Sequence, residues 1–379
     1  METHDYDLHN YDLIVAGAGP AGAACAITAA RGGARVLLLE KDRFPRHKVC
    51  GEFVSPESLG LLEWLLGEAR FQGHRPVDSS RIFYRDRHAQ LPIAPAARSV
   101  SRSELDLELL LAARRAGVRA EEGVAIQKVE RPGNFTVTTA IGTFAAPAVV
   151  NATGRWSQLG HPAGDTKKNR EKWIGIKAHF TEDAPPLSVD LYFFDGGYCG
   201  VTPMSDQSVN ACALVRADVA RSLDEVLGLH PELRRRSRAW RPLFAPLTTS
   251  GVHFQPPRTE SDGMMLAGDA AAFIDPYTGD GISLALHSGT LAGRALLPFL
   301  QGQATLDQAH AVYREGYFRH FSPAFRHSAW VRRLLTAPHW LRSLALGLAG
   351  TKTMARALVH GTRVRGTKEI ISRELLKIG

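Results

Sequence analysis

The feature that most constrains the fold is a G-x-G-x-x-G motif at residues 17–22. It follows a short apolar run at 13–16 and leads into an Ala-rich stretch at 21–31. A second apolar run at 36–39 is followed by Glu40. A short apolar run is typical of a buried parallel strand, and an unbroken Ala-rich stretch favours a helix. The order of strand, glycine turn, helix, strand and acidic residue therefore predicts a Rossmann-type dinucleotide-binding unit.

Each glycine of this motif has a physical role. Gly17 permits the tight turn, Gly19 lets the backbone approach a pyrophosphate, and Gly22 lets helix and strand pack closely. The helix N-terminus presents unpaired N–H groups to the phosphates. Glu40 is placed to accept hydrogen bonds from a ribose. The alternative is a glycine-rich turn that binds nothing.

A second glycine-rich stretch lies far along the chain. A predicted strand at 264–267 ends at Gly268 and Asp269, and a turn up to Gly281 leads into a long helix at 282–297. This pattern predicts that the dinucleotide-binding fold is completed by a second segment. Another glycine turn with no ligand is the alternative here too.

The region between these segments has a different character. Alternating stretches at 173–180, 188–194, 198–202 and 209–215 predict antiparallel strands, with a hairpin turn at 195–197. Residues 217–245 are predicted to be helical. We therefore expect four regions, which are a dinucleotide-binding part at 1–165, a β-rich substrate domain at 166–255, a second dinucleotide-binding part at 256–305 and a helical basic region at 306–379.

The first part contains further predicted elements. Ser55 and Pro56 indicate a helix start, and a second helix is expected at 103–115 with Ser103 as its cap. Arg102 lies just before that helix, where it can contact a cofactor or solvent. Strands are expected at 127–130, 135–139 and 148–151. Cys50 and Glu52 lie in the preceding loop, where they face a cofactor or pack a turn.

The positive charge is concentrated at the C-terminal end. The chain has a net charge of +8, and residues 326–379 carry eleven Lys and Arg against two Glu, a net charge of +9. Tryptophans accompany these arginines, which predicts peripheral contact with an anionic membrane. The alternative is a terminal helix packed on the domain with a solvated basic face. No nucleic-acid-binding motif accompanies the charge, so we expect no nucleic-acid partner.

The four cysteines have neither zinc-site nor C-x-x-C spacing, so no metal site is expected. Their use fits a reducing compartment. The polar residues 1–10 do not predict a signal peptide, and no apolar run reaches about 18 residues. We expect a cytoplasmic protein whose basic region contacts the inner face of a membrane.

Three motifs together resemble FAD-dependent oxidoreductases of the para-hydroxybenzoate hydroxylase fold. They are GAGPAG at 17–22 with Glu40, NATG at 151–154 and GDAAAFIDPYTGDGI at 268–282. Within that group, KVCGEF at 48–53 resembles the geranylgeranyl reductase family, where a K-x-C-G stretch lies near the isoalloxazine ring. YCGVTP at 198–203 resembles the strand that lines the substrate cavity there. The resemblance covers roughly residues 11–300.

The resemblance implies FAD bound through a set of named residues. They are Gly17, Gly19, Gly22, Glu40, Arg102, Gly268 and Asp269, with the helix start at Gly281 beside the flavin ring. It also implies reduction of a carbon–carbon double bond in an apolar small-molecule substrate, with Cys50 and Tyr198 near the ring as catalytic candidates. Only one G-x-G-x-x-G follows a strand, so we expect NAD(P)H to bind transiently or electrons to come from an external donor protein.

Some positions depart from the related families. Thr153-Gly154 replaces the Asp-Gly pair of the hydroxylases, yet a flavin monooxygenase acting on an aromatic or polyene remains the second hypothesis. GEFVSP also resembles flavin-dependent halogenases, which need a lysine beyond this motif. No lysine occurs between Lys48 and Lys128, so a halogenase ranks third. A flavoprotein that passes electrons to a membrane quinone is the remaining alternative.

Overall fold

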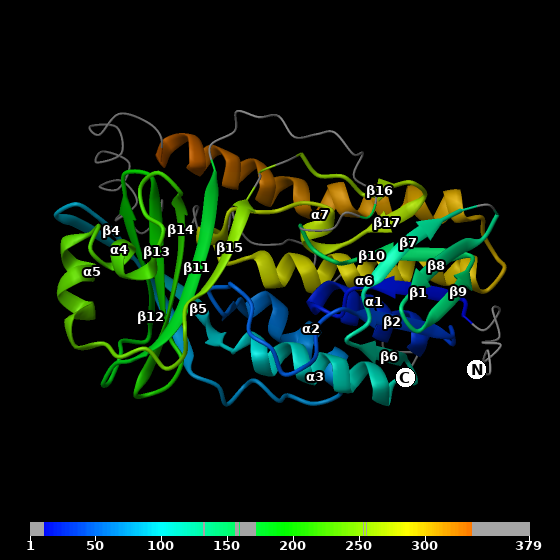
Figure 1. Cartoon of the computed structure of the whole chain (residues 1–379), viewed down its shortest axis with the longest axis horizontal. Helices are drawn as coiled ribbons and strands as arrows, with labels where there is room; N and C mark the ends of the chain where they lie inside the picture. The colour runs from blue at the N-terminus through cyan, green and yellow to red at the C-terminus, as the bar shows by residue number, and fades with distance from the viewer. Residues whose placement is uncertain are drawn as a thin grey trace.

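The computed structural model describes residues 11–335, except 132, 156–158, 160–171, 253 and 255. Two large sheets lie at opposite ends of the molecule, and the long helix α7 extends along both of them (Figure 1). The predicted α/β fold, with a Rossmann-type unit and a second sheet rich in antiparallel strands, is confirmed. The division of the chain into four residue ranges stays a prediction.

The six-stranded sheet forms the dinucleotide-binding end. Its strand order is β16-β17-β10-β1-β2-β6. The strands are β1 (Leu13–Ala16), β2 (Val36–Glu40), β6 (Arg119–Glu122), β10 (Ala148–Asn151), β16 (Glu260–Ser261) and β17 (Met264–Leu266). All neighbours pair in parallel except β16 with β17. β1, β2 and β10 are buried throughout, as expected for central parallel strands.

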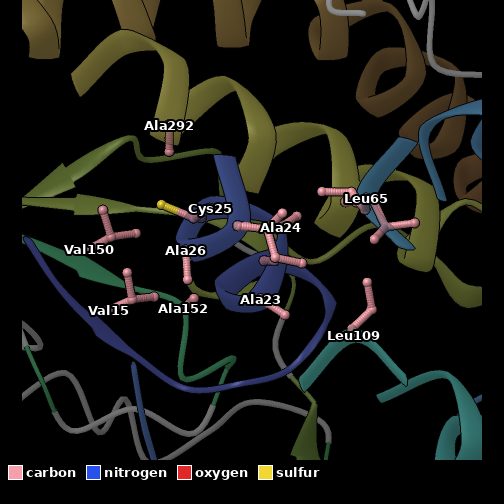
Figure 2. Packing of buried hydrophobic residues seen from close by; sticks show 14 of the residues in the cluster. Val15, Ala23, Ala24, Cys25, Ala26, Leu65, Leu109, Val150, Ala152 and Ala292 are labelled. Atoms are coloured by element: carbon pink, nitrogen blue, oxygen red, sulfur yellow. The ribbon is translucent and has the colours of Figure 1, made fainter. Parts of the chain in front are cut away.

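Small residues bring the helices close to this sheet. Figure 2 shows α1 (Pro20–Arg31) between Val15 and Val150 of the sheet and Ala292 of α6 (Gly281–Leu300). A Cβ on Gly293 would lie 2.8 Å from the carbonyl oxygen of Cys25. Glycine and alanine therefore allow two helices and a sheet to pack almost backbone to backbone. The helices α2 (Pro56–Leu66) and α3 (Arg102–Arg115) pack beside α1.

The eight-stranded sheet forms the other end of the molecule (Figure 1). Its order is β15-β11-β14-β13-β12-β4-β5-β3. The strands are β3 (Phe53–Val54), β4 (Pro76–Tyr84), β5 (Arg87–Ser99), β11 (Trp173–Thr181), β12 (Ser188–Phe194), β13 (Gly197–Pro203), β14 (Ser208–Arg216) and β15 (Leu247–Val252). The four predicted strands and the hairpin turn before Gly197 are present. Three further strands come from residues 53–99, and β4 pairs with β12 in parallel.

A smaller sheet and several short helices complete the described fold. The strands β7 (Ile126–Glu130), β8 (Phe135–Thr139) and β9 (Gly142–Ala146) form a three-stranded sheet. The short helices are α4 (Leu223–Leu227), α5 (Pro231–Arg236) and three 3₁₀ segments, η1 (Ser237–Ala239), η2 (Gly268–Ala270) and η3 (Pro276–Thr278).

Two local expectations were wrong. Residues 217–245 do not form a long helix, because Gly228 and Pro231 interrupt the helical pattern and separate α4 from α5. The cap of α3 is Ser101, whose Oγ accepts a hydrogen bond from the Ser103 amide at 3.2 Å. Arg102 is therefore the first residue of the helix rather than a loop residue.

The C-terminal described element is α7 (Leu306–Leu335). Tyr313, Tyr317 and Phe321 are buried, whereas Phe318 is exposed. The Tyr313 hydroxyl donates a hydrogen bond to the Leu266 carbonyl at 2.6 Å, which ties α7 to the six-stranded sheet. The predicted helices beyond Leu335 lie outside the described residues. Within the described part of the chain, no helix has the length and apolar character needed to cross a membrane.

Candidate active site

A cavity of about 1710 Å³ joins the two large sheets. At one end it is lined by the glycine turns after β1 and β17, and at the other end by strands of the eight-stranded sheet. Drug-sized ligands occupy cavities of about 300–1,000 Å³. The volume is therefore sufficient for a dinucleotide together with a second molecule.

The first glycine turn is shaped by contacts that no side chain could occupy. Gly17 has a φ of +93°, and a Cβ there would lie 2.6 Å from the Ala152 carbonyl oxygen. A Cβ on Gly22 would overlap the carbonyl oxygen of Gly17. Gly19 faces open space, and the nearest atom to its missing Cβ is Arg102 Nη2 at 4.0 Å. The turn therefore leaves room for a ligand directly above the N-terminus of α1.

The Glu40 side chain both stabilises the glycine turn and lines the cavity. Its carboxylate accepts hydrogen bonds from the Ala18 amide at 2.9 Å and the Asp42 amide at 3.1 Å. Arg46 pairs with the same carboxylate at 3.2 Å. Glu40 thus holds the glycine turn against the end of β2 while its side chain remains part of the cavity wall.

Arg102 is fixed by a bidentate contact with Asp106. Its Nε and Nη2 both donate to that carboxylate at 2.7 Å, and the Asp106 side chain is fully buried. Burial alone would lower the pKa of Arg102, but the charge and hydrogen bonds of the Asp106 carboxylate have the larger effect, so the pKa is raised. The cation is therefore held beside Gly19, where an anionic group of a dinucleotide would lie.

The second glycine segment packs against the start of α1 at the same cavity end, where a Cβ on Gly268 would lie 2.8 Å from the Ala21 Cβ. Gly268 has a φ of +62°, and its amide donates to Ser288 Oγ at 2.9 Å. Burial raises the pKa of Asp269, while Arg155 at 3.8 Å opposes that shift. A Cβ on Gly281 would meet no atom within 4 Å, so the start of α6 is open to the cavity.

A buried charged cluster holds the loop that contains Cys50. Glu52 is fully buried with a φ of +56°, and its carboxylate pairs with Lys177 and with His179 Nε2 at 2.6 Å. The same carboxylate accepts the Arg102 amide at 2.8 Å. Burial raises the pKa of Glu52, but the hydrogen bond from His179 and the charge of Lys177 prevail, so the pKa is lowered. The left-handed backbone at Glu52 is thus held by three partners.

Further contacts fix Cys50 itself. The Cys50 carbonyl accepts a hydrogen bond from Asn210 Nδ2 at 2.9 Å, and the Glu52 amide donates to Cys50 Sγ at 3.4 Å. Lys177 Nζ also donates to the Lys48 carbonyl at 3.3 Å. The loop at 48–52 is therefore attached to β11 and β14 of the other sheet.

Lys177, His179 and Asn210 were absent from the sequence prediction. Lys177 and His179 alternate on a strand that is otherwise apolar, so both side chains face the same side of the sheet. The sequence signal that could have identified them is a pair of polar residues, two positions apart, within an otherwise apolar strand. Their partner could not be found, because Glu52 lies 125 residues from Lys177 in the sequence.

Tyr198 lies in the apolar part of the cavity, which we call the aromatic chamber. Its ring packs against Phe193 and Tyr277 at centroid distances of 5.4 and 5.9 Å. The chamber is formed by Ile82, Tyr84, Trp173, Val189, Leu191, Phe193, Tyr198, Leu214, Val252, Phe254, Phe273 and Tyr277. Gly200 also lines the cavity and leaves the wall without a side chain at that point.

Most of the predicted site residues meet at this cavity. Gly17, Gly19, Glu40, Cys50, Arg102, Tyr198, Gly268, Asp269 and Gly281 line it. Gly22 lies behind the turn, where its missing side chain lets α1 approach Gly17. The roles assigned to these residues remain predictions. Among the described residues no cluster of His, Cys, Asp and Glu is arranged to hold a metal ion.

Comparison with known proteins identifies the family. The model of the FAD binding domain family matches residues 10–316, which is most of the chain. The chain belongs to the FAD-binding domain family. This flavoprotein is therefore an FAD-dependent oxidoreductase of the para-hydroxybenzoate hydroxylase type, as its motifs predicted.

Curated relatives extend over nearly the whole flavoprotein. Menaquinone reductase of Mycobacterium tuberculosis is 30% identical, over 95% of this chain and 91% of the relative. Digeranylgeranylglycerophospholipid reductase 2 of Methanopyrus kandleri is 26% identical, over 96% of each chain. Among solved structures, the flavin-dependent brominase Bmp2 has a TM-score of 0.77 at 20% identity, over 97% of this chain and 98% of the other. This last similarity concerns the fold.

The residues of the cavity fit FAD. The space above Gly19 at the start of α1, with Arg102 beside it, suits a pyrophosphate. Gly281 and Asp269 line the same cavity, and α6 begins at Gly281. The aromatic chamber continues from this end toward β12, β13 and β14, so a substrate bound there would lie next to the flavin.

Proposed function

We propose that the flavoprotein reduces a carbon–carbon double bond of an apolar substrate bound in the aromatic chamber. The observation that carries this proposal is the chemical character of the chamber wall, which consists of aliphatic and aromatic side chains. Such a wall binds apolar surface and excludes water. Two relatives of matching length carry reductase names, which supports the same reaction class.

Bound FAD, once reduced by NAD(P)H or by an external donor protein, supplies the hydride. The residues of the chain then hold the substrate and provide a proton. Tyr198 lines the chamber and is protonated at neutral pH even at the ordinary tyrosine pKa of about 10, and burial raises its pKa further. Its position makes Tyr198 our candidate proton donor, and Cys50 is the candidate residue that faces the ring from the loop at 48–52.

The positions of the lysines support a reductase over a halogenase. Of the described residues that line the cavity, the lysines are Lys41 and Lys48, and Lys48 pairs with Asp42 at 2.6 Å. Lys177 is fully buried against Glu52. The amine of Lys48 is thus engaged by Asp42 and that of Lys177 by Glu52, whereas a halogenase would need a free amine beside the substrate to handle hypohalous acid.

Anaerobic turnover tests the proposal. The purified holoprotein would be reduced without oxygen with one equivalent of dithionite per flavin and mixed with a polyprenyl phospholipid or a polyprenyl quinone, and products would be measured by mass spectrometry after any quinol had been reoxidised to quinone, so that only reduced double bonds add mass. We expect reoxidation of the flavin and a gain of two mass units per reduced double bond. A product formed only with oxygen would indicate a monooxygenase, and one that also required halide would indicate a halogenase.

Two variants test the proposed residues. Tyr198→Phe is expected to slow the reoxidation of reduced flavin by substrate by about 100-fold, which is the range for loss of a general acid. Cys50→Ala is expected to slow it while FAD remains bound. The absorption spectrum reports FAD retention in both variants, and full activity of either one would remove that residue from the mechanism.

A further inference from the structure

The last turns of α7 have an inner face that forms part of the cavity. Val331 and Arg332 line the cavity, and the exposed Arg333 lies at the cavity edge, where the inner and outer faces of the helix meet. Arg332 pairs with Asp275 at 3.1 Å and lies over the Phe254 ring at 4.3 Å. The Tyr277 hydroxyl donates to the Ser328 carbonyl at 2.7 Å. This end of α7 is therefore one wall of the aromatic chamber.

The outer face of the same turns carries a tryptophan between two arginines. Trp330 is 55% exposed, and Arg326 and Arg333 are also exposed. Spacings of four and three residues place these three side chains on one face of a helix. We call Arg326, Trp330 and Arg333 the outer face of α7.

The composition of this face suits one kind of partner. An exposed tryptophan is amphipathic and settles at the interface between lipid headgroups and acyl chains. Arginines beside it attract anionic lipids, each by about fivefold in affinity. The outer face also begins the region from 326 to 379, which has a net charge of +9. Charge complementarity therefore favours an anionic bilayer.

We propose that the outer face of α7 docks the protein on an anionic bilayer, so that the cavity edge formed by Val331, Arg332 and Arg333 meets the lipid surface. One helix end then has two functions, because its outer face contacts lipid and its inner face borders the chamber. An apolar substrate passes between bilayer and chamber without crossing water. Only the identity of that substrate rests on the proposed function, and the docking itself does not.

A vesicle-flotation experiment with the full-length holoprotein tests this docking. The probes are phosphatidylcholine vesicles with and without about one-third phosphatidylglycerol. The test variant is Arg326→Gln with Trp330→Ser. The control is Arg314→Gln with Phe318→Ser, which removes one arginine and one exposed aromatic at the same spacing from an earlier part of α7. Retention of the flavin spectrum shows that each variant is folded.

We expect wild type to bind the anionic vesicles more tightly than the neutral ones. The test variant should bind the anionic vesicles about tenfold more weakly, and the control should bind them like wild type. Unchanged binding by the test variant, equal weakening by both variants, or no binding by wild type would each overturn the proposal.

The other occupants of this face give distinct results. If a second copy of the chain covered it, sedimentation without vesicles would show a concentration-dependent dimer that the test variant loses, and this would also overturn the proposal. Flotation needs no turnover, so its result is independent of the reductase test. A protein that binds vesicles but reduces no double bond would refute the proposed function alone.

Discussion

The six-stranded sheet meets the cavity mainly with glycine backbone, whereas the eight-stranded sheet meets it with aromatic rings and with a loop that buried charges hold in place. In the first region, Gly17, Gly19 and Gly22 act within one turn, and their effects come from missing side chains. In the second, Glu52 and Lys177 meet across 125 residues of sequence. The glycine-lined end of the cavity therefore depends on local backbone shape, whereas the loop of Cys50 depends on pairing between residues far apart in the sequence.

The largest effect is expected when a glycine of the first glycine turn is replaced by alanine, which adds a methyl group there. Gly22→Ala would place a Cβ onto the carbonyl oxygen of Gly17 and force α1 away from β1. We expect loss of FAD from the purified protein, measured by the ratio of flavin to protein absorbance. The matched control is Gly60→Ala in α2, where a Cβ meets no atom within 4 Å.

Gly60→Ala is expected to retain FAD and to stabilise the helix by about 0.5–1 kcal/mol, because alanine loses less conformational entropy. If Gly22→Ala also retained FAD, the result would contradict the hypothesis that FAD binding requires close packing of α1 against the first glycine turn.

The second prediction concerns the buried pair of Glu52 and Lys177. Removing one partner leaves an uncompensated buried charge, so Glu52→Gln and Lys177→Met are each expected to lower the free energy of unfolding by about 3–5 kcal/mol. Urea denaturation of the holoprotein measures this effect. The double variant Glu52→Gln with Lys177→Met should lose much less than the sum of the two single losses. Additive losses would show that the two charges do not depend on each other.

A smaller effect is expected where α7 is attached to the second glycine segment. Ser328 Oγ donates a hydrogen bond to the Asp275 carboxylate, which is buried. Ser328→Ala is expected to lower the free energy of unfolding by about 1.5–3 kcal/mol, the range for a hydrogen bond to a charged group. Ser322→Ala on the same helix is the control and should change stability little. Equal stability of both variants would show that this contact does not hold α7.

The smallest effect is expected in the pH dependence of the free energy of unfolding that arises from Glu52. Because the pKa of Glu52 is lowered in the folded protein, its contribution is fully present above its unfolded pKa of about 4.3. It is lost as the pH falls through the folded pKa. The difference in unfolding free energy between wild type and Glu52→Gln should be constant above about pH 5 and shrink below about pH 4. A difference that stayed constant at low pH would contradict a lowered pKa.

Several elements could be predicted from sequence because their determinants are neighbours in the chain. The apolar run at Leu13–Ala16, the glycine turn and the Ala-rich helix follow one another directly, and β1 and α1 formed where expected. The strands β12 and β13 were predictable because a two-residue turn joins them. The helix predicted over 217–245 was wrong because its apolar pattern was given more weight than Gly228 and Pro231.

Other features were decided only by tertiary structure. β4 pairs with β12, and this assigns residues 76–84 to a sheet formed mostly by much later strands. The fold also decided which side of α7 is covered, so that Tyr317 is buried while Phe318, the next residue along the helix, is exposed.

The glycine turn, the family and most of the predicted site residues that line the cavity could be read from the sequence alone. These features depend on missing side chains and on spacing within single segments, so they can be recognised in the sequence without knowledge of the tertiary structure. Tertiary structure alone decided that Glu52 would meet Lys177 and His179. It also decided that the end of α7 would close the aromatic chamber. The physical reason is that a buried charge is tolerated only when its partner is brought to it, and no local pattern encodes which distant residue that will be.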